Sequence, residues 1–182
     1  INIIRMKGQK MDGSIQVYYG NGRGKTTAAL GLGIRAAGVG KQVIMVQFLK
    51  KKHSDTLDFL KKLEPELQIF RFEKAACGYS DLSPKEKQEQ MLNIKNALGY
   101  SRKVLDTGQC DLLILDEIFG LVDYNIITIE ELMDLIAVKK DSMDLILTGR
   151  NLPDEVREIA DCVYSIQREK EKTPEILAQG NF

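Results

Sequence analysis

Hydrophobic residues along the chain fall into short aliphatic runs separated by longer amphipathic segments. The runs at 43–46 and 112–115 do not alternate with polar residues, which is typical of strands covered on both faces. This pattern predicts strands at residues 15–19, 42–48, 67–72, 111–115, 144–148 and 161–166.

Helix signals lie between these strands. Residues 25–37 are rich in alanine and glycine and are followed by Gly38, a typical helix stop. Ser83 and Thr128 each precede a glutamate by three residues, which is the pattern of a capping box, and another helix is predicted to begin at Pro153. Strands that alternate with helices indicate an α/β fold: an open, mostly parallel sheet with helices on both faces.

The length of 182 residues favours a single domain. We expect it to span residues 1–182, with 1–13 as a flexible or accessory segment and 167–182 as a tail. Two possible lids interrupt the pattern, at residues 50–54 and 75–84.

Charge and composition narrow the possible partners and location. Lysine plus arginine and aspartate plus glutamate each total 26, so no overall field attracts nucleic acid or an anionic membrane. The apolar runs are too short to cross a bilayer, and the first residues lack the apolar stretch of a secretory signal. The three cysteines are widely spaced, which suits reduced thiols. We therefore expect a cytoplasmic protein that binds neither nucleic acid nor membrane.

A glycine-rich run follows the first predicted strand and opens the first predicted helix. Its members are Gly20, Asn21, Gly22, Arg23, Gly24, Lys25, Thr26 and Thr27. Glycines let backbone N–H groups converge on a phosphate, Lys25 supplies a cation, and the Thr26 hydroxyl can bind Mg²⁺. Tyr19 stands where the strict P-loop signature has glycine or alanine, so this is a variant P-loop. The alternative is a glycine-rich turn without a ligand.

Three charged residues follow other predicted strands. Asp116 and Glu117 end an apolar run, where carboxylates can hold Mg²⁺ or its waters; the alternative is a solvated strand end. Arg150 ends another strand, where it either neutralises phosphates or pairs with Asp154.

Two further basic positions leave alternatives open. Arg35 is either a surface charge or a contact to the far end of a nucleotide, and its spacing from Lys25 favours the first. The lysines at 50–52 form either a solvated face or a contact to an acidic ligand.

Together these motifs resemble the P-loop family of ATP:corrinoid adenosyltransferases. The resemblance rests on the segments 18–29, 35–40, 46–50, 115–117, 147–150 and 160–161, in this order and spacing. It implies a RecA-like P-loop NTPase architecture. It also implies transfer of the 5′-deoxyadenosyl group of ATP to the cobalt(I) of a corrinoid such as cob(I)alamin, with release of triphosphate.

The resemblance also implies roles for individual residues. The P-loop, with Lys25 and Thr26, would hold the triphosphate and Arg150 would face it. Glu117 would hold Mg²⁺ with Thr26, supported by Asp116. Asn21 and Arg35 would contact the nucleoside end. The chain has no tryptophan, so Tyr79 would offer the aromatic face below the corrin. Relatives further imply a homodimer and a flavoprotein reductant.

Two other functions remain open from the sequence. One is a RecA-like ATPase that couples hydrolysis to motion. The other is a non-catalytic relative that binds nucleotide or corrinoid; its support is a lid without tryptophan and a tail, from Arg168 to Pro174, without the histidine that the family usually carries.

Overall fold

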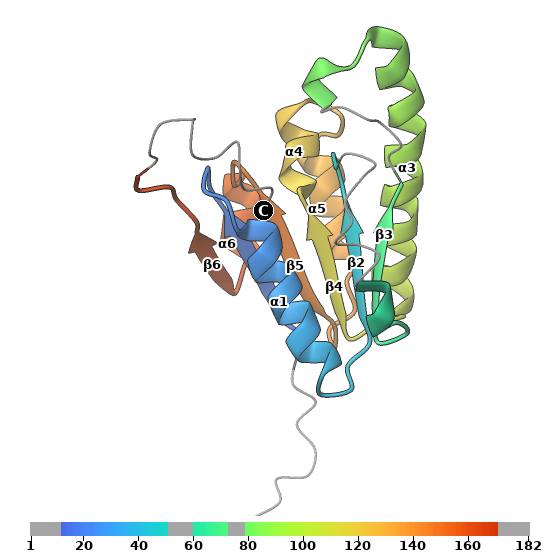
Figure 1. Cartoon of the computed structure of the whole chain (residues 1–182), viewed down its shortest axis with the longest axis vertical. Helices are drawn as coiled ribbons and strands as arrows, with labels where there is room; N and C mark the ends of the chain where they lie inside the picture. The colour runs from blue at the N-terminus through green and yellow to red at the C-terminus, as the bar shows by residue number, and fades with distance from the viewer. Residues whose placement is uncertain (1–11, 51–59, 73–78, 171–182) are drawn as a thin grey trace, which may run out of the picture.

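The computed structural model describes residues 12–50, 60–72 and 79–170. Six parallel strands in this part of the chain form one sheet, in the order β3-β2-β4-β5-β1-β6 (Figure 1). Their bounds are β1 (Ile15–Tyr19), β2 (Val43–Gln47), β3 (Leu67–Arg71), β4 (Leu112–Asp116), β5 (Asp144–Gly149) and β6 (Cys162–Ser165).

Helices cover both faces of the sheet, as the sequence predicts. The α-helices are α1 (Lys25–Ala37), α3 (Pro84–Thr107), α4 (Ile118–Asp123), α5 (Ile129–Ala137) and α6 (Asp154–Ile159), and short 3₁₀ helices lie at η1 (Lys61–Leu63) and η2 (Tyr79–Asp81). Apolar residues of α1 join one core cluster, and those of α3 to α6 join the other. The sheet therefore separates α1 from the remaining α-helices described.

Strand β2 shows why the apolar runs do not alternate. Val43 and Met45 belong to the cluster under α1, whereas Ile44 and Val46 belong to the cluster on the opposite face. Every residue of β2 and β4 is buried. A strand buried on both faces gains from aliphatic side chains at every position, so the predicted central strands are confirmed.

The bounds of most elements agree with the sequence predictions to within two residues. Both capping boxes are present: the Ser83 side chain accepts a hydrogen bond from the Glu86 N–H, and Thr128 does the same for Glu131. Helix α4 was not predicted. The predicted segments 1–13 and 167–182 lie largely outside the described residues, as do residues 51–54 of the first lid and residues 75–78 of the second.

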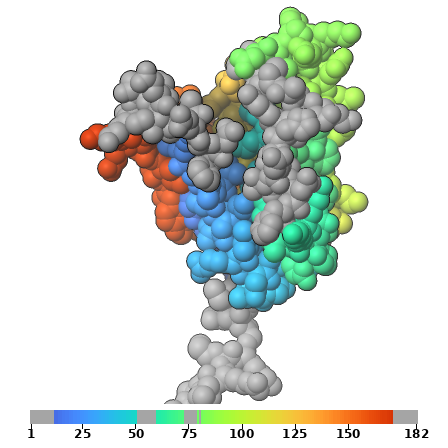
Figure 2. Space-filling view, in the orientation of Figure 1, coloured from blue at the N-terminus to red at the C-terminus, as the bar shows by residue number. Residues whose placement is uncertain are grey.

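The strand order brings the predicted motifs to one edge of the sheet. Strand β5 lies between β1 and β4, with Tyr19 opposite Gly149, and Asp116 lies opposite Gln47 of β2. In parallel sheets the carboxyl ends of the strands form the edge at which ligands bind. Helix η2 and the start of α3 project beyond this edge (Figures 1 and 2).

In the part of the chain that the structure describes, we find no helix with the length and apolar character needed to cross a membrane.

Candidate functional site

The glycine-rich run forms a loop between β1 and α1. Gly20 and Gly24 adopt φ angles of 121° and 113°, which residues other than glycine rarely adopt. A Cβ atom on Gly20 would also lie 2.3 Å from the carbonyl oxygen of Ile166. The Gly20 N–H donates to the Arg150 carbonyl (3.0 Å) and the Gly22 N–H to the Ile166 carbonyl (2.9 Å). The ends of β5 and β6 therefore hold the loop in place.

Tyr19, the departure from the strict P-loop signature, belongs to β1 rather than to the loop. The Arg157 guanidinium lies 5.4 Å from the centre of its ring. The loop proper begins at Gly20, so a larger residue at position 19 leaves the shape of the loop unaffected.

A pocket of about 450 Å³ opens above this loop. It is lined by Gly20, Asn21, Lys25, Glu117, Arg150 and Arg168. All of these residues except Arg168 were expected at the site from the P-loop and strand-end motifs. Arg23 and Thr27 also belong to the loop region but are exposed, and neither lines the pocket.

The Lys25 side chain folds back over the loop. Its ammonium donates to the carbonyl oxygens of Gly20 (2.7 Å) and Gly22 (3.0 Å). Burial lowers the pKa of Lys25, while the Glu117 carboxylate opposes this by raising it and Lys50 lowers it further. A phosphate group would offer this ammonium a negatively charged partner in place of two neutral carbonyls.

Asp116 is the centre of a hydrogen-bond network next to the P-loop, although neither Asp116 nor Thr26 lines the pocket. Its carboxylate is completely buried, and it accepts hydrogen bonds from the hydroxyls of Thr26 (2.9 Å) and Thr148 (2.7 Å) and from the Gln47 amide (3.0 Å). The Lys50 ammonium lies 3.4 Å from the same carboxylate. A buried carboxylate requires such partners, because isolated charge is costly away from water.

Glu117 lines the pocket and has an unusual backbone conformation. Its φ of 64° lies in the left-handed region, where the chain turns from β4 into α4. The Glu117 N–H donates to the Thr148 hydroxyl at 2.9 Å. Thr148 therefore connects the two acidic residues, since it holds the carboxylate of one and the backbone of the other. The family resemblance implies that Glu117 holds Mg²⁺ with Thr26 and that Asp116 supports it; in the structure the Thr26 hydroxyl contacts Asp116.

Three basic residues outside the P-loop reach this edge of the sheet. Arg150 lines the pocket, and Asp154, its alternative partner, lies 3.9 Å from Arg157 instead. Lys50 contacts Asp116 rather than forming a wholly solvated face; residues 51 and 52 lie outside the described part. Arg168 was not expected at the site, because no motif surrounds it and only its position after β6 brings it there.

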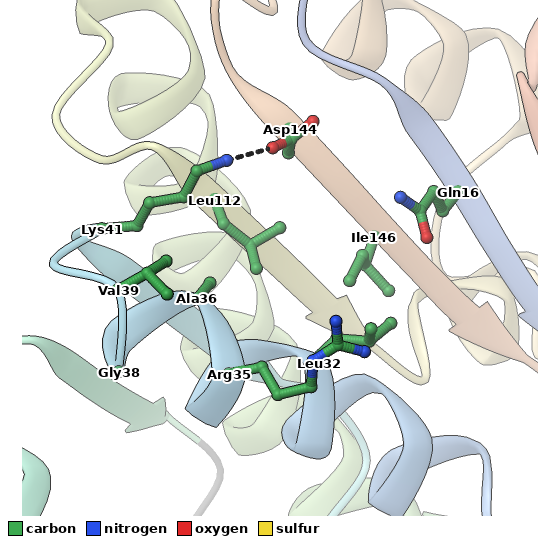
Figure 3. A pocket seen from close by; sticks show the side chains of 10 residues that line it. All are labelled: Gln16, Leu32, Arg35, Ala36, Gly38, Val39, Lys41, Leu112, Asp144 and Ile146. Atoms are coloured by element: carbon green, nitrogen blue, oxygen red, sulfur yellow. Dashed lines mark hydrogen bonds and ion pairs between the residues drawn. The ribbon is translucent and has the colours of Figure 1, made fainter. Parts of the chain in front are cut away.

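Arg35 lies at the opposite end of α1, in its last turn. It lines a second pocket, of about 510 Å³, beside the ion pair of Lys41 and Asp144 (Figure 3). The two pockets have no lining residue in common. The structure therefore does not bring Arg35 to the phosphate loop, and its expected contact with the nucleoside end gains no support.

Tyr79 lies in η2, beyond the carboxyl edge of the sheet. Its ring centre is 5.3 Å from that of Tyr124 at the end of α4, and the Lys87 ammonium lies 5.7 Å from it. Tyr79 does not line the pocket above the glycine-rich loop, which we call the phosphate pocket. It is connected to that pocket through α4, which begins directly after Glu117.

Comparisons with known proteins agree with this geometry. A family model described as ATP:corrinoid adenosyltransferase BtuR/CobO/CobP matches residues 11–179. Corrinoid adenosyltransferase of Escherichia coli K12 is 30% identical over 155 residues, 85% of this chain and 76% of that protein. Corrinoid adenosyltransferase CobA of Salmonella typhimurium is 30% identical over 159 residues, 87% of this chain and 79% of that protein.

A solved structure supports the fold alone. The KaiC-like protein PH0186 from Pyrococcus horikoshii superposes with a TM-score of 0.57 at 20% identity, and covers 89% of this chain and 75% of that one. This likeness agrees with the expected fold, an open and mostly parallel sheet with helices on both faces. The extended family match and the two curated relatives confirm the resemblance seen in the sequence: this chain belongs to the ATP:corrinoid adenosyltransferase family.

Proposed function

We propose that this chain transfers the 5′-deoxyadenosyl group of ATP to the cobalt(I) of a corrinoid and releases triphosphate. Membership of the adenosyltransferase family supports this reaction. The observation that carries it is the phosphate pocket, in which Lys25, Arg150 and Arg168 surround a glycine-rich loop at the carboxyl edge of the sheet.

In this reaction the protein does not need to form a covalent bond with either reactant. Cobalt(I) supplies the electron pair that forms the cobalt–carbon bond at C5′, and the C5′–O5′ bond breaks with its electron pair leaving on the triphosphate. The protein must hold the two reactants in line and stabilise the negative charge that develops on the leaving group. Lys25, Arg150 and Arg168 are suited to that second task, because cations and preorganised donors stabilise phosphate charge.

Thr26 and Asp116 are suited to hold a Mg²⁺ ion. The Thr26 hydroxyl and the Asp116 carboxylate are hard oxygen donors, and their oxygens lie 2.9 Å apart. Neighbouring ligands of an octahedral ion with bonds of about 2.1 Å are separated by about 3.0 Å, close to this distance. We propose that Thr26 and Asp116 hold the ion, directly or through water, with Glu117 at the side of the pocket. The ion would supply additional positive charge to the triphosphate.

Within the described residues no group of three or more histidine, cysteine or acidic side chains could hold a metal. Proteins usually bind Mg²⁺ through one or two side chains together with substrate phosphates and water, so the proposed site does not require such a cluster.

We place the corrinoid beyond the carboxyl edge, where η2 and the start of α3 project (Figure 1). Tyr79 would contact the lower face of the ring. Since Lys87 lies near the Tyr79 ring, a corrin that stacks on Tyr79 would have to share that face with Lys87 or displace it. By resemblance we also propose a cytoplasmic homodimer that receives electrons from a flavoprotein.

An anaerobic assay with ATP, Mg²⁺ and chemically reduced cob(I)alamin tests the proposal. We expect the cobalt(I) absorbance to disappear as adenosylcobalamin and triphosphate accumulate in equal amounts. Release of ADP and phosphate would instead identify an ATPase, and neither product would identify a binding protein.

Substitution of the P-loop lysine is the first variant to measure. Lys25→Ala should reduce kcat/KM at least about 100-fold, because it removes a cation from the phosphate pocket. Lys95→Ala, at an exposed position of α3, is the matched control and should behave like the wild type. Unchanged turnover in Lys25→Ala would contradict the proposed role of the P-loop.

A further inference from the structure

The side chain of Lys50 contacts both residues that are suited to hold the metal, Thr26 and Asp116. Its ammonium is 3.2 Å from the Thr26 hydroxyl oxygen and 3.4 Å from an Asp116 carboxylate oxygen. Asp116 is completely buried, whereas the Lys50 side chain is 29% exposed. Among the described residues that contact the Asp116 carboxylate, the two hydroxyls and the amide are neutral, so Lys50 supplies the positive charge.

The backbone before Lys50 is firmly anchored. Phe48 is completely buried, and its N–H donates to the Asp116 carbonyl at 2.9 Å. Leu49 adopts a φ of 55°, and its side chain packs against Gly120 of α4. These contacts fix the point from which the Lys50 side chain extends. The approach of its ammonium to Thr26 and Asp116 therefore follows from the local fold.

We infer that the Lys50 ammonium occupies the metal position when no nucleotide is bound, and that Mg²⁺ bound with ATP displaces it. A divalent ion coordinated by Thr26 and Asp116 would need the oxygen lone pairs that Lys50 now contacts, and the two cations would repel each other at that distance. This inference rests on the proposed metal site. It gives Lys50, whose role the sequence left open, a positioning role in that metal site.

Displacement has two consequences. Before nucleotide binds, Lys50 balances the buried charge of Asp116 and lowers the affinity of the site for a free divalent ion. After displacement, the ammonium remains beside the triphosphate, where phosphate oxygens replace the carboxylate as its partner. The site would therefore bind the metal with the nucleotide in preference to the metal alone.

Titration with Mn²⁺ in the absence of nucleotide tests this inference, with free Mn²⁺ measured by electron paramagnetic resonance. Lys50→Met, which keeps the length of the side chain but removes its charge, should bind Mn²⁺ on the order of tenfold more tightly than the wild type. Lys103→Met, at an exposed position of α3, is the matched control and should bind like the wild type.

Thermal unfolding gives a second readout. Lys50→Met should have a lower Tm than the wild type in metal-free buffer, because Asp116 loses its ion pair. Saturating Mn²⁺ should then raise the Tm of the variant by more than that of the wild type, since a ligand that binds more tightly stabilises more. This comparison also shows whether the variant is folded.

Each outcome decides the question. Unchanged or weaker Mn²⁺ binding by Lys50→Met would overturn the inference, as would a lack of measurable binding by both proteins. Asp116→Asn separates this failure from that of the proposed metal site. If Asp116→Asn abolishes Mn²⁺ binding while Lys50→Met leaves it unchanged, the metal site stands and the role of Lys50 fails. If Asp116→Asn also binds normally, the metal site itself is wrong.

Discussion

Thr148 shows how one small polar residue organises the site. Its hydroxyl donates to the buried Asp116 carboxylate and accepts the N–H of Glu117, although the sequence motifs assigned this residue of the 147–150 segment no role of its own. A hydroxyl suits this position because it is both donor and acceptor. Thr148 thus fixes two acidic residues that face different partners, one toward Thr26 and the other toward the pocket.

Thr148→Val should therefore be destabilising despite its similar shape. We expect the free energy of unfolding to fall by about 1–3 kcal/mol, because the Glu117 N–H loses its partner and Asp116 loses a donor. Urea denaturation measures the change. Thr148→Ser retains the hydroxyl and should recover most of the loss; equal stability of the valine variant and the wild type would show that the hydroxyl contributes little.

Cys110 should be chemically inert in the folded protein. Burial raises the pKa of its thiol to about 12 from an ordinary value of 9.0. The folded state thus favours the neutral thiol. The resulting stabilisation is fully present below about pH 9 and is lost as the pH rises from there toward 12.

At pH 8 a thiol reagent should consequently modify Cys110 only after denaturation, while the partly exposed Cys162 reacts in the native protein. Peptide mapping by mass spectrometry identifies the modified position. Equal rates of Cys110 modification with and without denaturant would contradict its burial.

The sequence predicted the residues at the site better than their contacts. Lys25, Glu117 and Arg150 meet because each follows or opens an element at the carboxyl edge, which motif spacing reveals. Arg168 could not be assigned, since no motif surrounds it and only its position after β6 brings it to that edge. The sequence left two alternatives open for Lys50, and the structure shows its ammonium in contact with Asp116. The spacing of Arg35 from Lys25 favoured a surface charge, and Arg35 is exposed in the last turn of α1.

Helix α4 depends on a close approach to β5. A Cβ atom on Gly149 would lie 2.4 Å from the Cβ of Phe119, so the end of the strand and the helix touch through a residue without a side chain. Because Glu117 directly precedes α4, the position of this helix also sets that of the pocket carboxylate.

Gly149→Ala should push α4 away from β5. We expect a loss of about 1–3 kcal/mol in the free energy of unfolding, as for other overpacked cores, together with lower adenosylation activity. Gly99→Ala in α3 is the control and should raise the free energy of unfolding. Among the described residues, no atom outside the neighbouring backbone of its own helix lies within 4 Å of the added Cβ, and alanine favours the helix by about 0.5–1 kcal/mol. Chemical denaturation of both variants distinguishes the two cases, and a tolerated alanine at position 149 would mean that α4 adjusts easily.

Elements with strong local signals were predicted well, and α4 was not. The caps at Ser83 and Thr128 define the starts of α3 and α5 from the sequence alone. Helix α4 instead begins after a left-handed Glu117 without a side-chain cap, and its residues 118–121 are buried. An apolar run that short does not reveal its period, so tertiary packing determines its structure.

Burial of the strand residues decreases across the sheet, from its central strands to the edge at β6. Strands β4 and β5 are buried almost throughout, whereas the last two residues of β6 are exposed. Amide protection follows such differences, because edge residues open locally while central ones exchange through global unfolding.

Native-state hydrogen exchange should show the slowest amides in β4 and β5 and faster exchange in β6. Mass spectrometry of peptides from each strand provides the measurement, with urea added below the unfolding transition to identify global opening. Protection of β6 equal to that of β4 would show instead that the edge unfolds only with the core.

The position of β1 in the sheet affects the order of events during synthesis. This strand lies near the start of the chain, yet its neighbours are β5 and β6, which begin at residues 144 and 162. The P-loop that follows β1 is likewise held by the carbonyls of Arg150 and Ile166. A nascent chain must therefore expose β1 until β5 and β6 have left the ribosome, so the P-loop gains its supporting contacts only after residue 166 has been synthesised.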